Sequence, residues 1–344
     1  MANFLDQLNN TTRILFSIPL RPIQGDRFQP TGFPSLGAAT YQTKSGQKLL
    51  VESAQSMANR LEATCWDSAT NQPVAALRGI SHVTVTRHGN FLTDSMQEAH
   101  RINSAYILEG KKDRSFFNTL KEALGGLEEG PIDRRKLAET LLRFDIGCLI
   151  HGVFLAKKEL AGGRLRVARA LSAFIEASGV AIAASGGVKN DHVHPGKVEG
   201  DSKNHFGNIP FSRDEYVAER IDCHVNLDLG QIRGYGLPTQ VQELLVLLAL
   251  YKVRRLLDGD LRLRTACDLE PIDRDNIVAA RPDGWKLPNV GELETALTAA
   301  IRNCDGMMCN TTVTFDDPLR SAKENAGDAA TAEEDNEDDN GDAD

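Results

Sequence analysis

Residues 28–41, FQPTGFPSLGAATY, and residues 49–62, LLVESAQSMANRLE, are the stretch that decides the fold. The first part predicts turns, because proline fixes φ and glycine permits positive φ. The second part predicts a helix over residues 50–63, with apolar residues at three- and four-residue steps: Leu50, Val51, Ala54, Met57, Ala58 and Leu61. Its other face carries Gln55, Ser56, Asn59 and Arg60, polar groups that suit the phosphates and riboses of a polyanion.

Further elements follow from the pattern of apolar residues along the chain. We expect strands over residues 12–20 (ended by Pro19), 146–156, 180–188, 216–229 and 261–269, and one or two strands within 74–87. Helices are expected over residues 164–177 and 239–257, the second opened by Pro238 and closed by Asp258-Gly259. This order fits a split βαβ (ferredoxin-like, RRM-like) core, although the pattern alone leaves other α+β folds open.

Two segments interrupt that core. Residues 100–144 look like an inserted lobe with helices over 115–124 and 133–144, joined by glycine-rich turns. Residues 190–211 are polar and rich in glycine and histidine, which predicts a mobile loop. We therefore expect one domain over residues 1–320, with insertions at about 100–145 and 190–215.

The charge of the chain is unevenly distributed. The net charge of −9 comes from residues 321–344, which hold ten acidic residues and one lysine; of 48 acidic and 39 basic residues, 38 of each remain elsewhere. The folded body is thus neutral, and contact with nucleic acid would need a local patch. The acidic tail lacks apolar residues larger than alanine, which predicts disorder.

Cellular location is predicted from what the sequence lacks. The first residues, MANFLDQLNNTTR, lack the basic and the apolar segment of a secretory signal. The most apolar stretch, residues 241–250, is too short to span a bilayer. The six cysteines form no CxxC pair, so we expect free or buried thiols rather than disulfides or a zinc site. We expect a cytoplasmic protein.

Phosphate-binding candidates lie on two predicted strands. Arg262 and Arg264 are two residues apart, so both leave one face of a strand, with Leu261 and Leu263 on the other. The alternative is local pairing with Asp260 or Asp268. Gly186, Gly187 and Lys189 end a predicted strand, where glycines would let backbone N–H groups approach a phosphate and the lysine would add charge.

Metal binding and catalysis have weaker candidates. His192 and His194, with Asp191 and His205, could hold a metal, but a polar loop rich in histidine is more often a solvated loop or an RNA-stacking surface, and we assign neither a metal nor a cofactor. His151 and His224 lie in apolar strand contexts and are expected to be core histidines. There is no GxSxG motif, and no catalytic residue is assigned.

The helix 50–63, together with residues 261–270, LRLRTACDLE, resembles the backbone subunit of CRISPR surveillance complexes. That subunit is the family-seven Cas protein of the RAMP superfamily, in the type I-G (formerly I-U) Cascade, and the resemblance covers residues 12–270. It implies a ferredoxin-like palm with inserted finger and thumb lobes, and a non-catalytic protein that polymerises along the guide RNA. Arg27, Gln55, Asn59 and Arg60 would then line the RNA path.

The resemblance also implies partners and an interface. The partners would be further copies of this chain, a large PAM-reading subunit, a subunit that binds and processes the guide end, and target DNA through guide pairing. A thumb would reach over the neighbouring copy, and two basic runs in the lobe are candidates for it: Lys111, Lys112 and Arg114, and Arg134 and Arg135. Phe116 would supply an apolar anchor or a stacking wedge.

Two other functions remain open. A metal-dependent endoribonuclease of the same superfamily would use Asp26 or the His192/His194 cluster; Asp26 could equally pair with Arg27. A stand-alone RRM-like protein would bind one RNA sequence through exposed aromatic residues on central strands, and the sequence has no such aromatic run.

Overall fold

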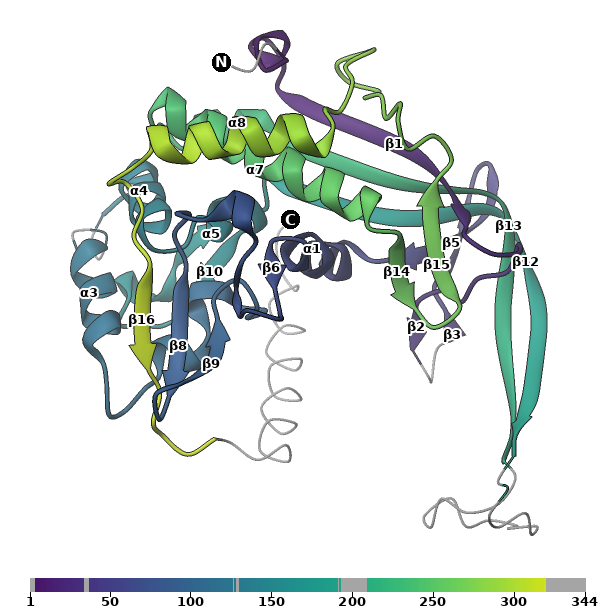
Figure 1. Ribbon diagram of the computed structural model, residues 1–344, viewed down its shortest axis with the longest axis horizontal. Helices are drawn as coiled ribbons and strands as arrows, with labels where there is room; N and C mark the ends of the chain where they lie inside the picture. The colour runs from purple at the N-terminus through teal and green to yellow at the C-terminus, as the bar shows by residue number, and fades with distance from the viewer. Residues whose placement is uncertain are drawn as a thin grey trace, which may run out of the picture.

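A strongly curved antiparallel sheet of seven strands forms the upper part of the molecule (Figure 1). The computed structural model describes residues 4–33, 37–125, 127, 130–190, 192 and 209–319. The strand order is β14 (Leu261–Arg264), β15 (Cys267–Pro271), β1 (Arg13–Pro22), β13 (Ile209–Asp228), β12 (Leu171–Lys189), β5 (Gly46–Glu52) and β4 (Thr40–Thr43).

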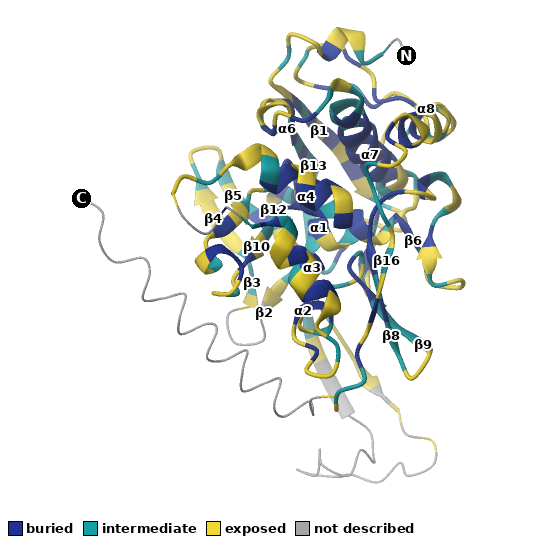
Figure 2. Cartoon of the chain, turned by 90° about the vertical axis from the view of Figure 1, so that its left-hand side faces the viewer, coloured by how far each residue is buried: buried dark blue, intermediate teal, exposed yellow. Residues whose placement is uncertain are grey.

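Helices cover one face of this sheet. α1 (Ala54–Ala63) and α7 (Thr239–Asp258) pack on it, and α8 (Val290–Asn303) packs on α7. Along β1, Ile14, Phe16, Ile18 and Leu20 are buried while Ser17 between them is exposed, as strand alternation requires. α7 is buried over most of its length and α8 only along one side (Figure 2). The fold is therefore mixed α and β, with an antiparallel main sheet.

A lobe hangs below one end of α7. Its small sheet has the order β16 (Thr311–Thr314), β8 (Val83–Arg87), β9 (Asn90–Asp94), and β16 runs parallel to β8. Around it lie α2 (Ala105–Leu108), α3 (Ser115–Ala123), α4 (Arg134–Phe144), α5 (Gly147–His151) and the hairpin of β10 (Val153–Leu155) and β11 (Leu165–Val167). The buried hydrophobic residues of lobe and main sheet form one cluster. The predicted division into domains stays a prediction.

Short elements complete the described chain: η1 (Asp6–Leu8), β2 (Gly32–Phe33), β3 (Gly37–Ala38), β6 (Trp66–Asp67), β7 (Gln72–Pro73), η2 (Ala75–Leu77), η3 (Arg101–Asn103), η4 (Ala161–Gly163) and α6 (Leu229–Gly234).

An arm formed by β12 and β13 projects from the main sheet (Figure 1). β12 pairs with β5 only as far as Ser178, and β13 pairs with β1 only from Ile221 onward. Farther out the two strands pair with each other, and Phe28 bridges to Tyr216. On this outer part Ile182 and Val188 are 60% and 52% exposed, so the arm presents apolar side chains to solvent.

Several predicted elements are confirmed. The strands expected over 12–20 and 216–229 are β1 and the second part of β13, and the strand over 180–188 is part of β12. The helices expected over 115–124, 133–144 and 239–257 are α3, α4 and α7. Pro19 does not end β1; it lies inside the strand, and its carbonyl accepts a hydrogen bond from Ile272 N at 2.9 Å.

The helix predicted over residues 50–63 begins later than expected. Leu50 and Val51 belong to β5, and the helix starts at Ala54 because Ser53 is extended and its hydroxyl caps Ser56 N at 3.2 Å.

The helix predicted over residues 164–177 is wrong, because this segment contains β11 and the start of β12. Leu171, Ala173 and Ile175 are buried in alternation with Ser172 and Phe174, a period of two, and all five pair with β13. The short segment also fits a helical spacing, and only pairing with β13 decides between them.

Other boundaries differ through local backbone conformation. Residues 146–156 form α5 and then β10 rather than one strand, because the side chain of Asp145 accepts from Gly147 N and Gly152 has a positive φ of 79°. Residues 261–269 form a hairpin of β14 and β15, turning at Ala266. Within 74–87 only β8 is a strand of the sheet, and η2 precedes it. α8 and β16 were not predicted. Most of the predicted loop 190–211 and the acidic tail lie outside the described residues, and 209–211 belong to β13.

A buried ion pair joins α1 to the lobe. Arg101 of η3 donates from Nε and Nη2 to the two carboxylate oxygens of Glu62 in α1, both at 2.7 Å. Its Nη1 donates to Gly152 O at 3.2 Å. Both side chains are buried, so neither charge could be solvated if its partner were removed.

Arg101→Met should therefore lower the free energy of unfolding by about 3–5 kcal/mol, because it leaves the Glu62 carboxylate buried and unpaired. The double variant Arg101→Met/Glu62→Leu should be less destabilised than this single variant. Arg135→Met, which removes an exposed i,i+4 pair with Glu139, is the matched control and should cost less than about 1 kcal/mol. Urea unfolding measures all three; equal losses for Arg101→Met and Arg135→Met would contradict the assignment.

Candidate nucleic-acid interface

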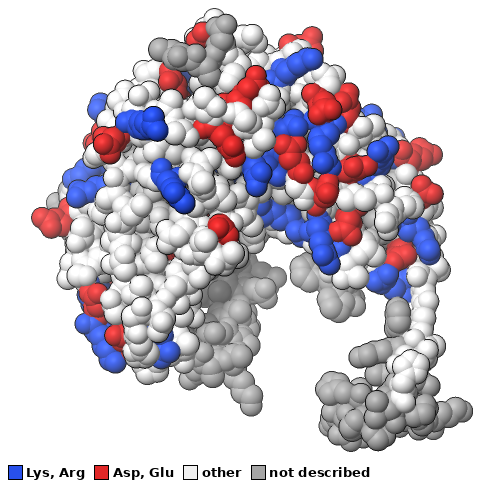
Figure 3. Space-filling view, viewed as in Figure 1, with Lys and Arg blue, Asp and Glu red and all other residues white. Residues whose placement is uncertain are grey.

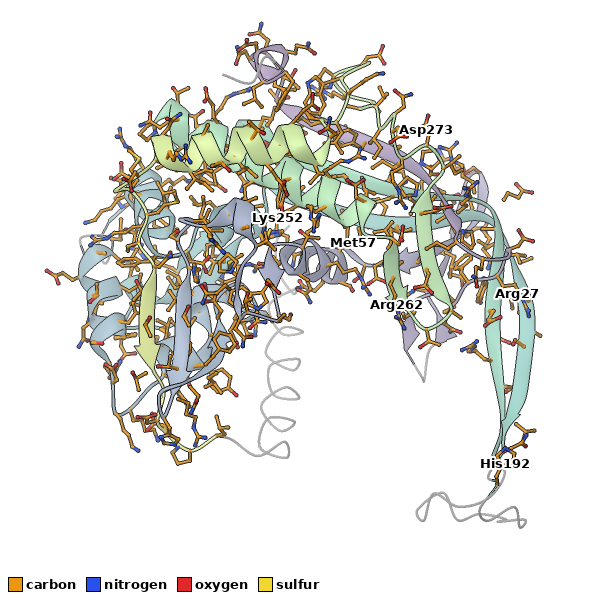
Figure 4. All side chains as sticks on the ribbon, in the orientation of Figure 1. Arg27, Met57, His192, Lys252, Arg262 and Asp273 are labelled. Carbon is orange, nitrogen blue, oxygen red and sulfur yellow. The ribbon has the colours of Figure 1, made fainter. Side chains whose placement is uncertain are left out.

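The underside of the molecule is hollowed between the lobe and the arm (Figure 3). α1 and β14 lie above this hollow, and segment 22–27 after β1 lies on the side of the arm (Figure 1). We call this surface the underside and define it by α1, β14 and segment 22–27. Figure 4 places Arg262 at the lower part of β14, beside the hollow, and Arg27 toward the arm.

Arg27 and Arg262, both predicted RNA-binding residues, meet at one cavity. It has a volume of about 700 Å³ and lies between segment 22–27 and the β14–β15 hairpin. The Arg27 side chain is 58% exposed, with its guanidinium 3.6 Å from Glu215. The Arg262 side chain is 83% exposed and 3.9 Å from Asp268. These separations are longer than those of firm hydrogen bonds, so both guanidiniums can turn to a phosphate.

Arg60 and Arg264 have a different role. Both contact the carboxylate of Glu52, which is only 2% exposed: Arg60 Nε lies 3.1 Å from Oε1, and Arg264 pairs with Oε2. Arg60 Nη1 donates to Arg262 O at 3.0 Å, and Arg264 Nη1 donates to Gln29 O at 3.0 Å. Burial lowers the pKa of both guanidiniums, yet arginine keeps its charge at any ordinary pH. These two arginines hold the sheet together, and this contact occupies the guanidiniums that we expected to bind RNA.

Gln55 and Asn59 lie exposed on α1, as predicted, while Met57 and Leu61 are buried. Gln55 Oε1 accepts a hydrogen bond from Arg169, and Gln55 Nε2 lies 3.5 Å from Asn59 Oδ1. Arg169 precedes β12 in the segment predicted as a helix, and sequence reasoning did not find it as a neighbour of α1.

Gly186 and Gly187 lie near the end of a strand, as predicted. Both lie inside β12, opposite Ser212 and Phe211 of β13, and Lys189 is the last residue of the strand. Among the described residues, this part of β12 pairs with β13 on one side only, so the role of the two glycines in binding a phosphate stays a prediction. Lys189 stays a prediction.

Most residues of the two basic runs in the lobe already contact other groups of the chain. Lys112 Nζ donates to Asp316 O at 3.0 Å, Arg114 pairs with Glu159 at 3.2 Å, and Arg135 pairs with Glu139 at 2.8 Å. Lys111 is held through its backbone N–H, 2.6 Å from Asp317 Oδ2, and Arg134 lines a cavity of about 870 Å³ beside α6. Phe116 is buried edge-on against Phe144, so it anchors α3 and cannot be a stacking wedge.

Asp26 is exposed at the 700 Å³ cavity, near Asp260 and Asp268. In the described ranges no group of three or more His, Cys, Asp or Glu side chains could hold a metal ion. His192 is exposed near the tip of the arm (Figure 4); Asp191, His194 and His205 lie outside the described residues.

An aromatic pair lies on the open face of the main sheet. Phe174 of β12 and His224 of β13 have ring centroids 4.9 Å apart at 32°, and His224 Nδ1 lies 3.1 Å from Ser17 Oγ. His224 is thus not a core histidine, whereas His151 is buried as predicted. The alternation of residues 171–177 could have revealed Phe174, had that segment been assigned to a strand.

The resemblance to CRISPR-associated proteins is confirmed. Residues 14–182 match the family described as CRISPR-associated protein GSU0053. The sequence matches no curated protein.

Two solved structures show a more distant similarity. A chain of a "CRISPR RNA-guided surveillance complex, pre-nicking" is 13% identical, with 75% of this chain and 73% of that chain covered and a TM-score of 0.37. Csc2 of Thermofilum pendens is 9% identical, with 88% and 80% covered and a TM-score of 0.32. Similarities of this size establish neither a shared fold nor a shared function.

The arginines of this surface should differ in how much each contributes to the stability of the fold. Arg60→Ala and Arg264→Ala should each lower the free energy of unfolding by about 1–3 kcal/mol, because each removes a charged partner of the buried Glu52. Arg262→Ala should change it by less than about 0.5 kcal/mol, because the side chain is exposed. Urea unfolding tests this, and equal stability of all three variants would show that Glu52 does not depend on its arginines.

Proposed function

We propose that this chain is a non-catalytic subunit that binds a CRISPR guide RNA along the underside and polymerises to form the helical backbone of a DNA-targeting surveillance complex. The observation that carries the proposal is the pair of exposed, loosely held guanidiniums of Arg27 and Arg262 at one open cavity, in a chain that matches a CRISPR-associated family. Guides differ in sequence, so such a grip must act on the sugar–phosphate chain, and base pairing must supply specificity.

We further propose that β15, β1, β13 and β12, with α1 and α7, form a ferredoxin-like palm. Their adjacent, antiparallel pairing in that order supports it, because a split βαβ fold places its fourth strand beside the first and its second strand beside the third. The lobe around β8 would then be one inserted unit. Further copies of this chain, a PAM-reading subunit and a guide-end-binding subunit are the proposed partners. No helix in the described ranges is long and apolar enough to cross a bilayer.

The arm and the lobe are the two proposed contacts between copies. The arm projects from the sheet and exposes Ile182 and Val188, side chains that a neighbouring copy could bury. Head-to-tail contacts that do not close into a ring generate helical filaments, as a backbone along RNA requires.

A second candidate function has one observation in its favour. The Phe174–His224 pair on the two central strands is a place where an RRM-like protein would stack bases and read one RNA sequence.

RNA binding should be independent of sequence and steeply dependent on salt. Unrelated single-stranded RNAs of equal length should bind with equal affinity, measured by fluorescence anisotropy. Arg27→Ala/Arg262→Ala should reduce the slope of log K against log salt by about 1.4, roughly 0.7 for each lost phosphate contact. Arg302→Ala on α8, which lies away from the underside, is the control.

Other outcomes of the same experiment favour the alternatives. Strong preference for one RNA would support the RRM-like protein. Divalent-metal-dependent cleavage of the RNA that is lost in Asp26→Ala would support the endoribonuclease.

Assembly on long RNA should depend on the arm. Ile182→Glu/Val188→Glu should abolish filaments seen by electron microscopy and leave affinity for short RNA unchanged, because both side chains are exposed and charged residues there oppose burial. Arg302→Glu, at an exposed position of α8 outside the arm and the lobe, is the control. Filaments that persist in the arm variant and vanish in Lys111→Glu/Lys112→Glu/Arg134→Glu would assign the contact to the lobe.

A further inference from the structure

A further cavity lies between α1, η3 and the β10–β11 hairpin, and sequence reasoning did not find it. Its volume is about 560 Å³, and we call it the Phe154 pocket. The side chains used below are Gln55, His100, His151, Phe154, Arg166 and Arg169, all of which line it.

Phe154 is an exposed aromatic residue held in place by its hairpin. In β10 and β11 it pairs across the strands with Arg166, while the neighbouring pair Leu155 and Leu165 is fully buried. Strand alternation therefore turns Phe154 and Arg166 outward, and Phe154 stays 44% exposed. The guanidinium of Arg166 lies 4.6 Å from the ring centroid. A flat ring with an adjoining guanidinium is a surface on which a nucleobase can stack.

The pocket is positively charged. Its lining contains arginines and histidines and no carboxylate. Arg169 donates only to neutral acceptors, Gln55 Oε1 and Ala54 O, and within the described part of the chain neither Arg169 nor Arg166 has a carboxylate partner. The nearby carboxylate of Glu62 is held by Arg101, so the guanidiniums of Arg166 and Arg169 remain able to pair with an anion.

A buried amine lies next to the pocket. Lys252 of α7 is 2% exposed, and its Nζ lies 2.9 Å from Nε2 of His151, which lines the pocket. Burial and the neighbouring Lys252 lower the pKa of His151 well below its usual value, so the ring is neutral and its Nε2 accepts the hydrogen bond. No carboxylate pairs with Lys252 in the described ranges.

We propose that the Phe154 pocket holds one unstacked nucleotide of a single-stranded RNA, with its base on Phe154 and Arg166 and its phosphate between Arg169 and His100. The volume suits one nucleotide, being in the range of small-ligand pockets. Gln55, fixed by Arg169, lies within the same pocket and offers an amide to the edge of the base. The proposal rests on the proposed RNA-binding function and deepens it, because Gln55 also belongs to α1 of the underside.

The test uses the full chain and single-stranded RNA in an anisotropy titration. Phe154→Ala should weaken binding about 10-fold, within the range found for loss of one base–aromatic stack. Phe154→Trp should restore it. The matched control is Ile272→Ala, which removes an exposed apolar side chain outside the pocket and should change affinity less than 2-fold. Phe174→Ala tests the alternative stacking surface on the open face of the sheet.

An RNA with abasic sites separates stacking from damage to the fold. The unaltered protein should bind abasic RNA about 10-fold more weakly than normal RNA. The Phe154→Ala variant should bind the two RNAs with equal affinity. If the unaltered protein binds RNA and Phe154→Ala binds equally well, the pocket proposal fails alone. If Phe174→Ala is the weakened variant, the sheet face is the stacking surface and the pocket proposal is overturned. If the unaltered protein binds no RNA, the proposed function fails and the pocket proposal with it.

Discussion

The buried carboxylate of Glu52 joins two parts of the sheet that lie far apart in strand order. β5, which carries it, is next to one edge strand, and β14, which carries Arg264, is the opposite edge strand. Segment 28–31 spans the gap between them: Phe28 bridges to Tyr216, Gln29 N donates to Ala266 O, and Thr31 N donates to Val51 O. A charge this deeply buried is tolerated only with partners, so Arg60 and Arg264 fix the curvature of the sheet. The hollow of the underside follows from that curvature.

The sequence was informative where one spacing dominates. The apolar stripe of α7 and the alternation of β1 each match only one period, and both elements were predicted. Residues 171–177 fit two periods, and pairing with β13, which is distant in sequence, decides between them. Because this segment was predicted as a helix, Phe174 was not recognised as an exposed aromatic residue of the sheet.

The sequence predicted which residues lie at the candidate site better than it predicted what each of them does. Arg27, Arg60, Arg262 and Arg264 lie around one region, as the resemblance implied. Which of them remains free depends on Glu52, a residue that the helical pattern placed on α1 and that the structure places in β5. The sequence shows which residues are arginines, but it does not show which carboxylate is buried between them.

The parallel pairing of β16 with β8 has a consequence for how the chain matures. Thr311 pairs with Val83, so the small sheet of the lobe receives its last strand only when nearly all of the described chain has left the ribosome. Until then β8 has an unpaired edge, and contacts so distant in sequence form slowly. During synthesis the main sheet can form before the small sheet of the lobe is complete. In that interval the unpaired edge of β8 is open to a chaperone or to another nascent copy of the chain.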